Sequence, residues 1–171
     1  MALCSPATGR IIGFFFEYQY EQQKRLPYWS LGAYWTMWAG VATPQQAERL
    51  VKNLQRFEHD YGLAQTVEAY PSPHPEFEWL QWNYPTGWPP MQLMVIAGLD
   101  RYGYAEAAAR VARKFLTMMI ELYQSTGKLW EKYNVVEGNA NLPRERYVSQ
   151  PLHGWSCAAV VLLGRRIYDL E

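Results

Sequence analysis

The side chains with the clearest chemical potential in this sequence lie together at residues 81–90. This stretch reads QWNYPTGWPP and combines two indoles with a nearby pair of carboxamides. An indole face can stack on the C–H groups of a sugar ring, while amides hydrogen-bond to its hydroxyls. These residue types indicate a binding surface for a neutral, polyhydroxylated ligand. Each tryptophan could instead fill a hydrophobic core, so both interpretations stay open at this point.

The charge balance argues against polyanionic partners. The 171 residues contain 16 Lys and Arg and 16 Asp and Glu, which gives a formal net charge of zero. Binding to nucleic acid or to an anionic membrane relies on clustered cations, so we expect neither partner. The sequence also lacks a signal-peptide pattern at its start and an apolar run long enough to span a bilayer. We therefore expect a cytoplasmic protein.

Cysteine and histidine spacings indicate neither a metal site nor a cofactor. Cys4 and Cys157 lie far apart, and His59, His74 and His153 each stand alone. Zinc and redox motifs need such residues at short, repeated spacings. We expect reduced thiols, no metal and no cofactor.

Apolar periodicity predicts an all-α chain that folds as a single domain over residues 1–171. Ser30 and Thr43 have the residue types of helix N-caps, and Pro44 suits a first helical turn. Gly103 and Gly127 follow helical patterns, where glycine often ends a helix. The expected helices span residues 31–39, 44–54, 89–102, 104–124 and 155–168.

Two further stretches are expected to be non-helical. Residues 13–20 alternate with a period of two, which predicts a short extended or β-hairpin segment packed against aromatic groups. Residues 58–88 contain four prolines and no helical period, so we expect a long irregular connection of the kind that usually carries function. Helices joined by alternately short and long connections are typical of an α/α barrel, whose long loops form the site at one end.

Three segments of this sequence resemble the trehalases, glycoside hydrolase family 37. Residues 81–90 resemble the second family signature, Gln-Trp-Asp-x-Pro-x-Gly-Trp-x-Pro. Residues 38–50 (WAGVATPQQAERL) look like the family's WAGIASPEQAERL, and residues 127–135 (GKLWEKYNV) look like its GKLVEKYDV. The segments occur in the family's order, and the likeness extends from about residue 13 to residue 168. The resemblance implies a partial (α/α)6 toroid of antiparallel helical hairpins, forming the C-terminal part of the barrel.

The resemblance also implies a reaction and a set of site residues. Trehalases hydrolyse the disaccharide α,α-trehalose with inversion, which requires two carboxyl groups roughly 6.5–9.5 Å apart. The family's general base falls on Glu131, which the sequence pattern alone would assign to the surface. The same resemblance places Gln81, Trp82, Asn83 and Trp88 in the wall of the glucose subsites. For Trp82 and Trp88, packing in the core is the alternative.

This chain also departs from the family's pattern. Asn83 stands where the family has Asp, so a charge is lost. Counting back from Gly154 puts Arg146 where the family has a sugar-binding Glu, with Glu145 one residue away as the candidate replacement. Residues 136–150 lack the family's glycine-rich lid.

The family's general acid and its first signature lie upstream of the segment that begins near Gly13. We therefore expect a fragment of a trehalase-like enzyme that hydrolyses trehalose negligibly by itself. The alternative is a non-catalytic sugar-binding or structural subunit that completes a separately encoded N-terminal half. In either case, association with that half or self-association is expected to cover apolar faces.

Overall fold

The computed structural model describes residues 13–142, 147–151 and 154–169. The α-helices in these ranges are α1 (Trp35–Trp38), α2 (Pro44–Asn53), α3 (Pro89–Arg101), α4 (Ala105–Thr126) and α5 (Gly154–Tyr168), with short 3-10 helices η1 (Leu31–Tyr34) and η2 (Leu54–Arg56). Antiparallel pairs of two-residue strands join β1 (Tyr18–Gln19) to β2 (Lys24–Arg25), β3 (Glu58–His59) to β4 (Gly62–Leu63), and β5 (Thr86–Gly87) to β6 (Tyr133–Asn134).

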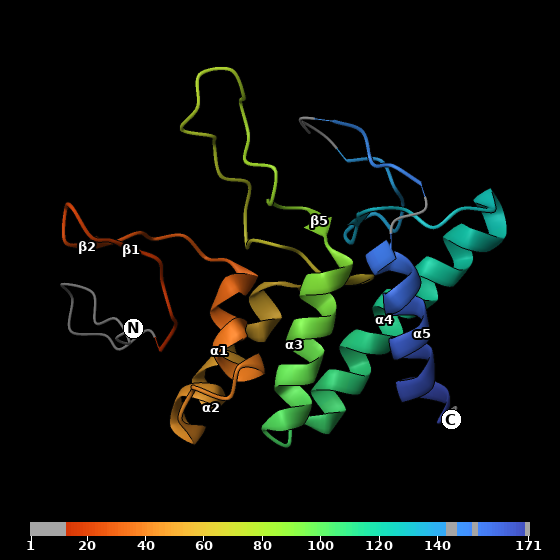
Figure 1. Cartoon of the computed structure of the whole chain (residues 1–171), viewed down its shortest axis with the longest axis horizontal. Helices are drawn as coiled ribbons and strands as arrows, with labels where there is room; N and C mark the ends of the chain where they lie inside the picture. The colour runs from red at the N-terminus through yellow and green to blue at the C-terminus, as the bar shows by residue number, and fades with distance from the viewer. Residues whose placement is uncertain (1–12, 143–146, 152–153, 170–171) are drawn as a thin grey trace.

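The helices form two layers, and the long connections rise from one end of them (Figure 1). Helices α1, α3 and α5 lie side by side, while α4 packs against both α3 and α5. The mainly helical fold and the short N-terminal hairpin that the sequence predicts are both confirmed. In the described part of the chain, none of the helices is both long and apolar enough to cross a membrane.

Local sequence signals account for the helix ends. The hydroxyl of Thr43 accepts from the backbone N–H of Gln46, whose side chain accepts from the backbone N–H of Thr43, so α2 begins with a complete capping box. Gly127 ends α4 with φ of +67°, in the left-handed region that glycine adopts at low cost. Ser30 precedes η1 but does not cap it, because its hydroxyl donates to Glu17 Oε1 at 3.0 Å.

The alternation expected over residues 13–20 is wrong for its first half. Phe14, Phe15 and Phe16 are all buried, and the strand covers only Tyr18 and Gln19. The ring centre of Phe14 lies 4.4 Å from that of Trp29, so this part of the chain threads through an aromatic cluster instead of forming a sheet with a solvent face. Because both sides are covered there, adjacent side chains are buried together. The expected aromatic environment is confirmed.

The irregular connection over residues 58–88 is confirmed in outline, but three short strands anchor it to the helices. Gln92, fully buried in α3, donates to the Leu63 carbonyl at 2.6 Å and accepts from the Leu63 N–H at 3.0 Å. The side-chain amide of Gln92 thereby satisfies the backbone N–H and C=O of Leu63, as a neighbouring strand would. At the other end of the connection, β5 pairs with β6 and joins the tryptophan-rich stretch to the segment that contains Glu131.

Gly87 makes this strand pairing possible. A Cβ atom at this position would lie 2.2 Å from Cγ1 of Val135, far inside van der Waals contact. Val135 is itself fully buried and lies directly after β6. Only a residue without a side chain therefore allows the two segments to approach this closely.

Candidate active site

The segment that carries Glu131 leads into β6 and is fixed through its backbone. Each backbone N–H and C=O group of Trp130, Glu131 and Lys132 forms a hydrogen bond. For Trp130, the N–H donates to the Tyr133 hydroxyl and the C=O accepts from the Ser156 hydroxyl. For Glu131, the N–H donates to the Gln150 carbonyl and the C=O accepts from the Trp155 indole. For Lys132, the N–H donates to the Ser149 hydroxyl and the C=O accepts from it. This backbone therefore has little freedom, as the support of a catalytic side chain requires.

Two of these contacts come from helix α5. The Trp155 indole donates to the Glu131 carbonyl at 2.7 Å, and the Ser156 hydroxyl donates to the Trp130 carbonyl. Burial raises the pKa of the Tyr133 hydroxyl above its usual value, so this group stays neutral while it accepts from the Trp130 N–H at 2.9 Å. The first turn of α5 and the Glu131 segment thus form one hydrogen-bonded unit.

The carboxylate of Glu131 is buried beside a cation and a phenol. Glu131 is 5% exposed, and its Oε1 accepts from the Tyr147 hydroxyl at 2.9 Å. The side chain of Lys132 is fully buried, with Nζ 3.9 Å from Glu131 Oε2. The same Nζ donates to the Tyr147 carbonyl at 3.2 Å and lies 3.9 Å from the centre of the Tyr147 ring. The opposite charges offset one another, and the lysine also holds Tyr147 near the carboxylate.

Trp82 and Trp88 form a stack beside this charge pair. Their ring centres are 4.2 Å apart with an angle of 7° between the planes, and Trp155 meets Trp88 edge-on at 5.9 Å. Lys132 Nζ lies 5.2 Å from the centre of the Trp88 ring. Trp88 is 1% exposed, which fits the core-packing alternative, whereas Trp82 is 38% exposed. Of the two predicted sugar-stacking residues, Trp82 is the one with an accessible face.

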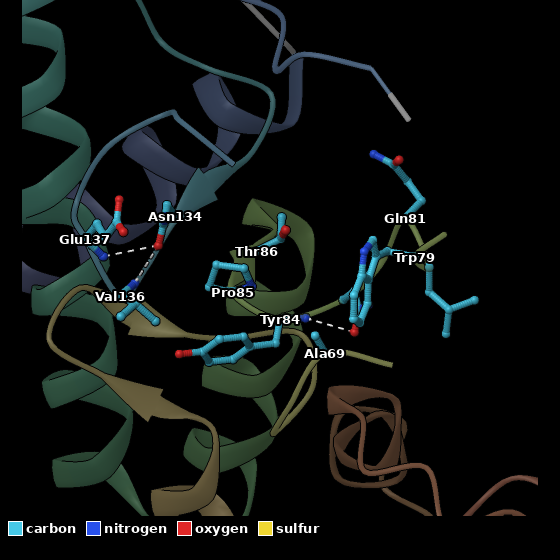
Figure 2. Close-up of a pocket in the computed structure, with 11 residues that line it drawn as sticks. Ala69, Trp79, Gln81, Tyr84, Pro85, Thr86, Asn134, Val136 and Glu137 are labelled. Atoms are coloured by element: carbon cyan, nitrogen blue, oxygen red, sulfur yellow. Dashed lines mark hydrogen bonds between the residues drawn. The ribbon is translucent and has the colours of Figure 1, made fainter. Parts of the chain in front are cut away.

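The other two predicted wall residues line a separate cavity of about 330 Å³ (Figure 2). Gln81 and Asn83 contribute to its lining, but Trp82, Trp88 and Glu131 do not. The structure therefore brings the stacked tryptophans to the neighbourhood of Glu131, whereas the two carboxamide residues that flank Trp82 line a different space. A sugar contact by Gln81 or Asn83 stays a prediction.

The amide of Asn83 has a clear structural task. Its Oδ1 accepts from the Tyr70 N–H at 2.9 Å, the Thr66 hydroxyl at 3.0 Å and the Tyr84 N–H at 3.1 Å. Its Nδ2 donates to the Tyr70 carbonyl at 2.8 Å, which a carboxylate could not do. Asn83 is 4% exposed and closes the base of the loop formed by residues 71–79, called the excursion below. The departure from the family's Asp therefore adds a donor that this loop uses.

Glu145, the candidate replacement for the family's sugar-binding Glu, lies outside the described residues, as does its neighbour Arg146. Lys132, Tyr147 and Trp155 contact Glu131 but were not predicted from the sequence. Adjacency to Glu131 was the available signal for Lys132. The other two lie 16 and 24 positions away from Glu131, and local pattern gave no signal for them.

Comparison with known proteins identifies relatives over most of the chain. The trehalase family profile matches residues 11–167. A cytosolic neutral trehalase from Kluyveromyces lactis is 36% identical over 129 residues, which cover 74% of this chain and 17% of the relative. One from Emericella nidulans is 39% identical over 126 residues, covering 72% of this chain and 17% of the relative. The chain thus spans about a sixth of the length of these curated relatives.

Solved structures agree with this assignment. The neutral trehalase from Saccharomyces cerevisiae superimposes with a TM-score of 0.74 and 32% identity, over 91% of this chain and 26% of that one. A glycoside hydrolase family 63 mannosylglycerate hydrolase from Thermus thermophilus, in complex with glucose, has a TM-score of 0.64 at 20% identity over 92% of this chain and 33% of its own, and shares the fold. From the profile match over residues 11–167 and these relatives, the chain belongs to the trehalase family.

Proposed function

We propose that this chain provides the general base and one aromatic wall of a glycoside hydrolase site that cleaves α,α-trehalose to two glucose molecules with inversion. The observation that carries the proposal is that the Glu131 carboxylate is buried and that each backbone N–H and C=O group of residues 130–132 is hydrogen-bonded. Family membership supplies the reaction class. We assign the rest of the site to residues beyond these 171, and the greater length of the relatives supports this assignment.

In the proposed reaction, Glu131 accepts a proton from a water molecule as the water oxygen bonds to the anomeric carbon. The glycosidic bond breaks on the opposite face of the sugar, and its oxygen leaves with the second glucose after protonation by a carboxylic acid. We assign that acid to a segment outside this chain. Tyr147 and Lys132 fix the orientation of the Glu131 carboxylate through the contacts described above.

The exposed face of Trp82 is suited to stack against a glucose ring, because the indole can meet the C–H groups of the sugar. Trp88 supports Trp82 from behind through the parallel stack. Gln81, Asn83 and Glu145 remain proposed sugar contacts by resemblance alone. For Asn83 the contact would have to coexist with its four hydrogen bonds to the protein.

Apolar faces on both sides of the helical layers support an incomplete toroid. On α1 the side chains of Trp35 and Trp38 are each 48% exposed, and on α5 Val161 and Leu162 are 53% and 51% exposed. We propose that the remaining helices of a trehalase-type (α/α)6 toroid cover these faces, because the solved yeast relative is about four times as long as the segment that matches here. The relatives' names support a cytosolic location for the assembled enzyme.

A complementation assay tests the reaction. The purified chain is assayed for glucose release from trehalose by itself and after co-expression with the region of the Saccharomyces cerevisiae enzyme that precedes the matching segment. We expect negligible release by the chain alone and measurable release by the pair. Glu131→Gln should lower the pair's rate by about 10²-fold or more, since a general base contributes about 10²–10⁴-fold.

The matched control is Glu121→Gln, which removes the same charge from an exposed position on α4 and should leave the rate unchanged. An unchanged rate in Glu131→Gln would contradict the assignment of the base. Rapid hydrolysis of trehalose by the chain alone would contradict the assignment of the general acid to a segment outside the chain. Light scattering during size-exclusion chromatography distinguishes association with the added region from self-association. If the chain stays a stable monomer both by itself and in the presence of the added region, the proposal of an incomplete toroid is contradicted.

A further inference from the structure

The described residues that line the cavity beside Gln81 do not include Glu131. Its walls come from the excursion that ends near Trp79, from the residues around β5, and from the turn after β6 (Figure 2). Its volume of about 330 Å³ lies at the lower end of the range of small-molecule sites, about 300–1,000 Å³. This size suits one sugar ring better than a disaccharide.

Two hydroxyl groups of the lining have no protein partner among the described residues. Thr86 is 4% exposed, and its side chain forms no hydrogen bond with them, although its backbone pairs with Asn134. The Tyr84 hydroxyl is likewise unbonded, while the Tyr84 N–H is held by Thr66 and Asn83. Both hydroxyls therefore keep their capacity to donate and accept hydrogen bonds, so the cavity is suited to a ligand that hydrogen-bonds to them.

The walls around these hydroxyls are pre-organised. Asn83 fixes both Tyr70 and Tyr84, and the excursion is closed further along by the hydrogen bond from the Leu80 N–H to the Tyr70 carbonyl at 3.3 Å. On the opposite side, the Asn134 Oδ1 accepts from the backbone N–H groups of Val136 and Glu137, both at 3.1 Å (Figure 2). Binding would therefore require little ordering of the backbone.

The described part of the lining favours a neutral ligand. Among these residues there is no Lys or Arg, and the charged side chain is Glu137, which accepts from Asn139 at 3.2 Å. A carboxylate in the wall disfavours phosphates and other anions. The indole of Trp79 and the phenol of Tyr84 supply aromatic surface beside hydroxyl and amide groups. Aromatic faces combined with neutral hydrogen-bonding groups match a neutral polyol ring.

We propose that this cavity binds a single neutral sugar ring at a site separate from Glu131, with the Thr86 hydroxyl as a direct contact. Binding at this cavity requires no hydrolysis, so the proposal stands independently of the reaction assigned to Glu131. Glucose is the natural probe because it is a single neutral sugar ring and would be released by the proposed reaction. A site of this kind would allow the protein to bind a product molecule without occupying the space beside Glu131.

The test is a calorimetric titration of the full 171-residue chain with glucose in a Glu131→Gln, Trp82→Ala background, which removes the carboxylate charge and the exposed indole on the Glu131 side. We expect binding to persist in this background. Adding Thr86→Val, which keeps the shape but removes the hydroxyl, should weaken it at least about five-fold, the loss of roughly one hydrogen bond. Adding Thr86→Ser, which restores a hydroxyl, should leave it within about two-fold of the background. Circular dichroism confirms that each variant is folded.

Absence of glucose binding in the background variant would overturn the proposal, as would equal affinities of the Thr86→Val and Thr86→Ser variants. Glucose 6-phosphate serves as the charged comparison and should bind more weakly than glucose. Tighter binding of the phosphate would contradict the charge argument. None of these results depends on trehalose cleavage, so failure of this site and failure of the proposed reaction are distinguishable.

Discussion

Replacement of Gly87 by alanine should destabilise the contact that joins the tryptophan-rich stretch to the Glu131 segment. The added Cβ would lie 2.2 Å from Val135 Cγ1, whereas apolar carbons rest about 3.5–4.0 Å apart. The overlap of about 1.5 Å cannot be relieved by a flexible side chain, because Val135 is fully buried and β-branched. Overpacking of a core costs about 1–3 kcal/mol, and we expect the upper part of this range.

The assay is urea unfolding followed by tryptophan fluorescence. With a slope of about 2 kcal/mol per molar urea, a loss of about 2–3 kcal/mol lowers the midpoint by about 1 M or more. Gly164→Ala is the matched control, since a Cβ there meets no atom within 4 Å and the residue lies inside α5. It should stabilise the chain by about 0.5–1 kcal/mol through helix propensity.

A double-mutant cycle tests whether the cause is the contact with Val135. Val135→Ala removes Cγ1 and leaves a small cavity, so it should destabilise the chain by itself. In that background, Gly87→Ala should cost at least about 1 kcal/mol less than in the original chain. An equal cost in both backgrounds would refute the steric explanation.

Three further predictions concern other parts of the fold. Ser149→Ala should lower the free energy of unfolding by about 2 kcal/mol, because two buried backbone groups beside the glutamate lose their partner, whereas the exposed Ser125→Ala should change it by less than about 0.5 kcal/mol; urea titration measures both. Asn83→Asp should cost about 1–3 kcal/mol at neutral pH, since a carboxylate would face the carbonyl to which the amide now donates, and equal urea midpoints would contradict this. Stability should also fall with pH in two stages. Burial lowers the pKa of His59, so the unfolded chain binds more protons as pH drops through about 6.5, and His59→Gln should abolish this first loss. For Glu58, burial raises the pKa but hydrogen bonds from an arginine and a lysine of α4 together lower it by more, so a second loss should begin near pH 4.5 and shrink in Glu58→Gln, as urea midpoints at about pH 7, 5.5 and 4 would reveal.

Local sequence signals predicted the helical part of the fold well. Caps and helix-ending glycines act within one turn, so Thr43 and Gly127 mark their helix ends whatever surrounds them. The alternation over residues 13–20 failed because it assumes one covered face and one solvent face. At Phe15 the rest of the molecule covers the second face as well, and no local pattern reports this.

The sequence by itself determined the family and therefore the identity of Glu131 as the candidate base, since ordered motifs persist along the chain. Tertiary structure alone decided what surrounds that carboxylate. The Tyr147 hydroxyl reaches this carboxylate from 16 residues away, and the Trp155 indole donates to the backbone carbonyl of the same residue from 24 residues away. Tertiary structure also decided that Trp82 stacks on Trp88 near Glu131, while its neighbour Gln81 lines a cavity that Trp82 does not line. The physical reason is that side-chain direction and burial depend on long-range packing, which residue spacing in the chain does not encode.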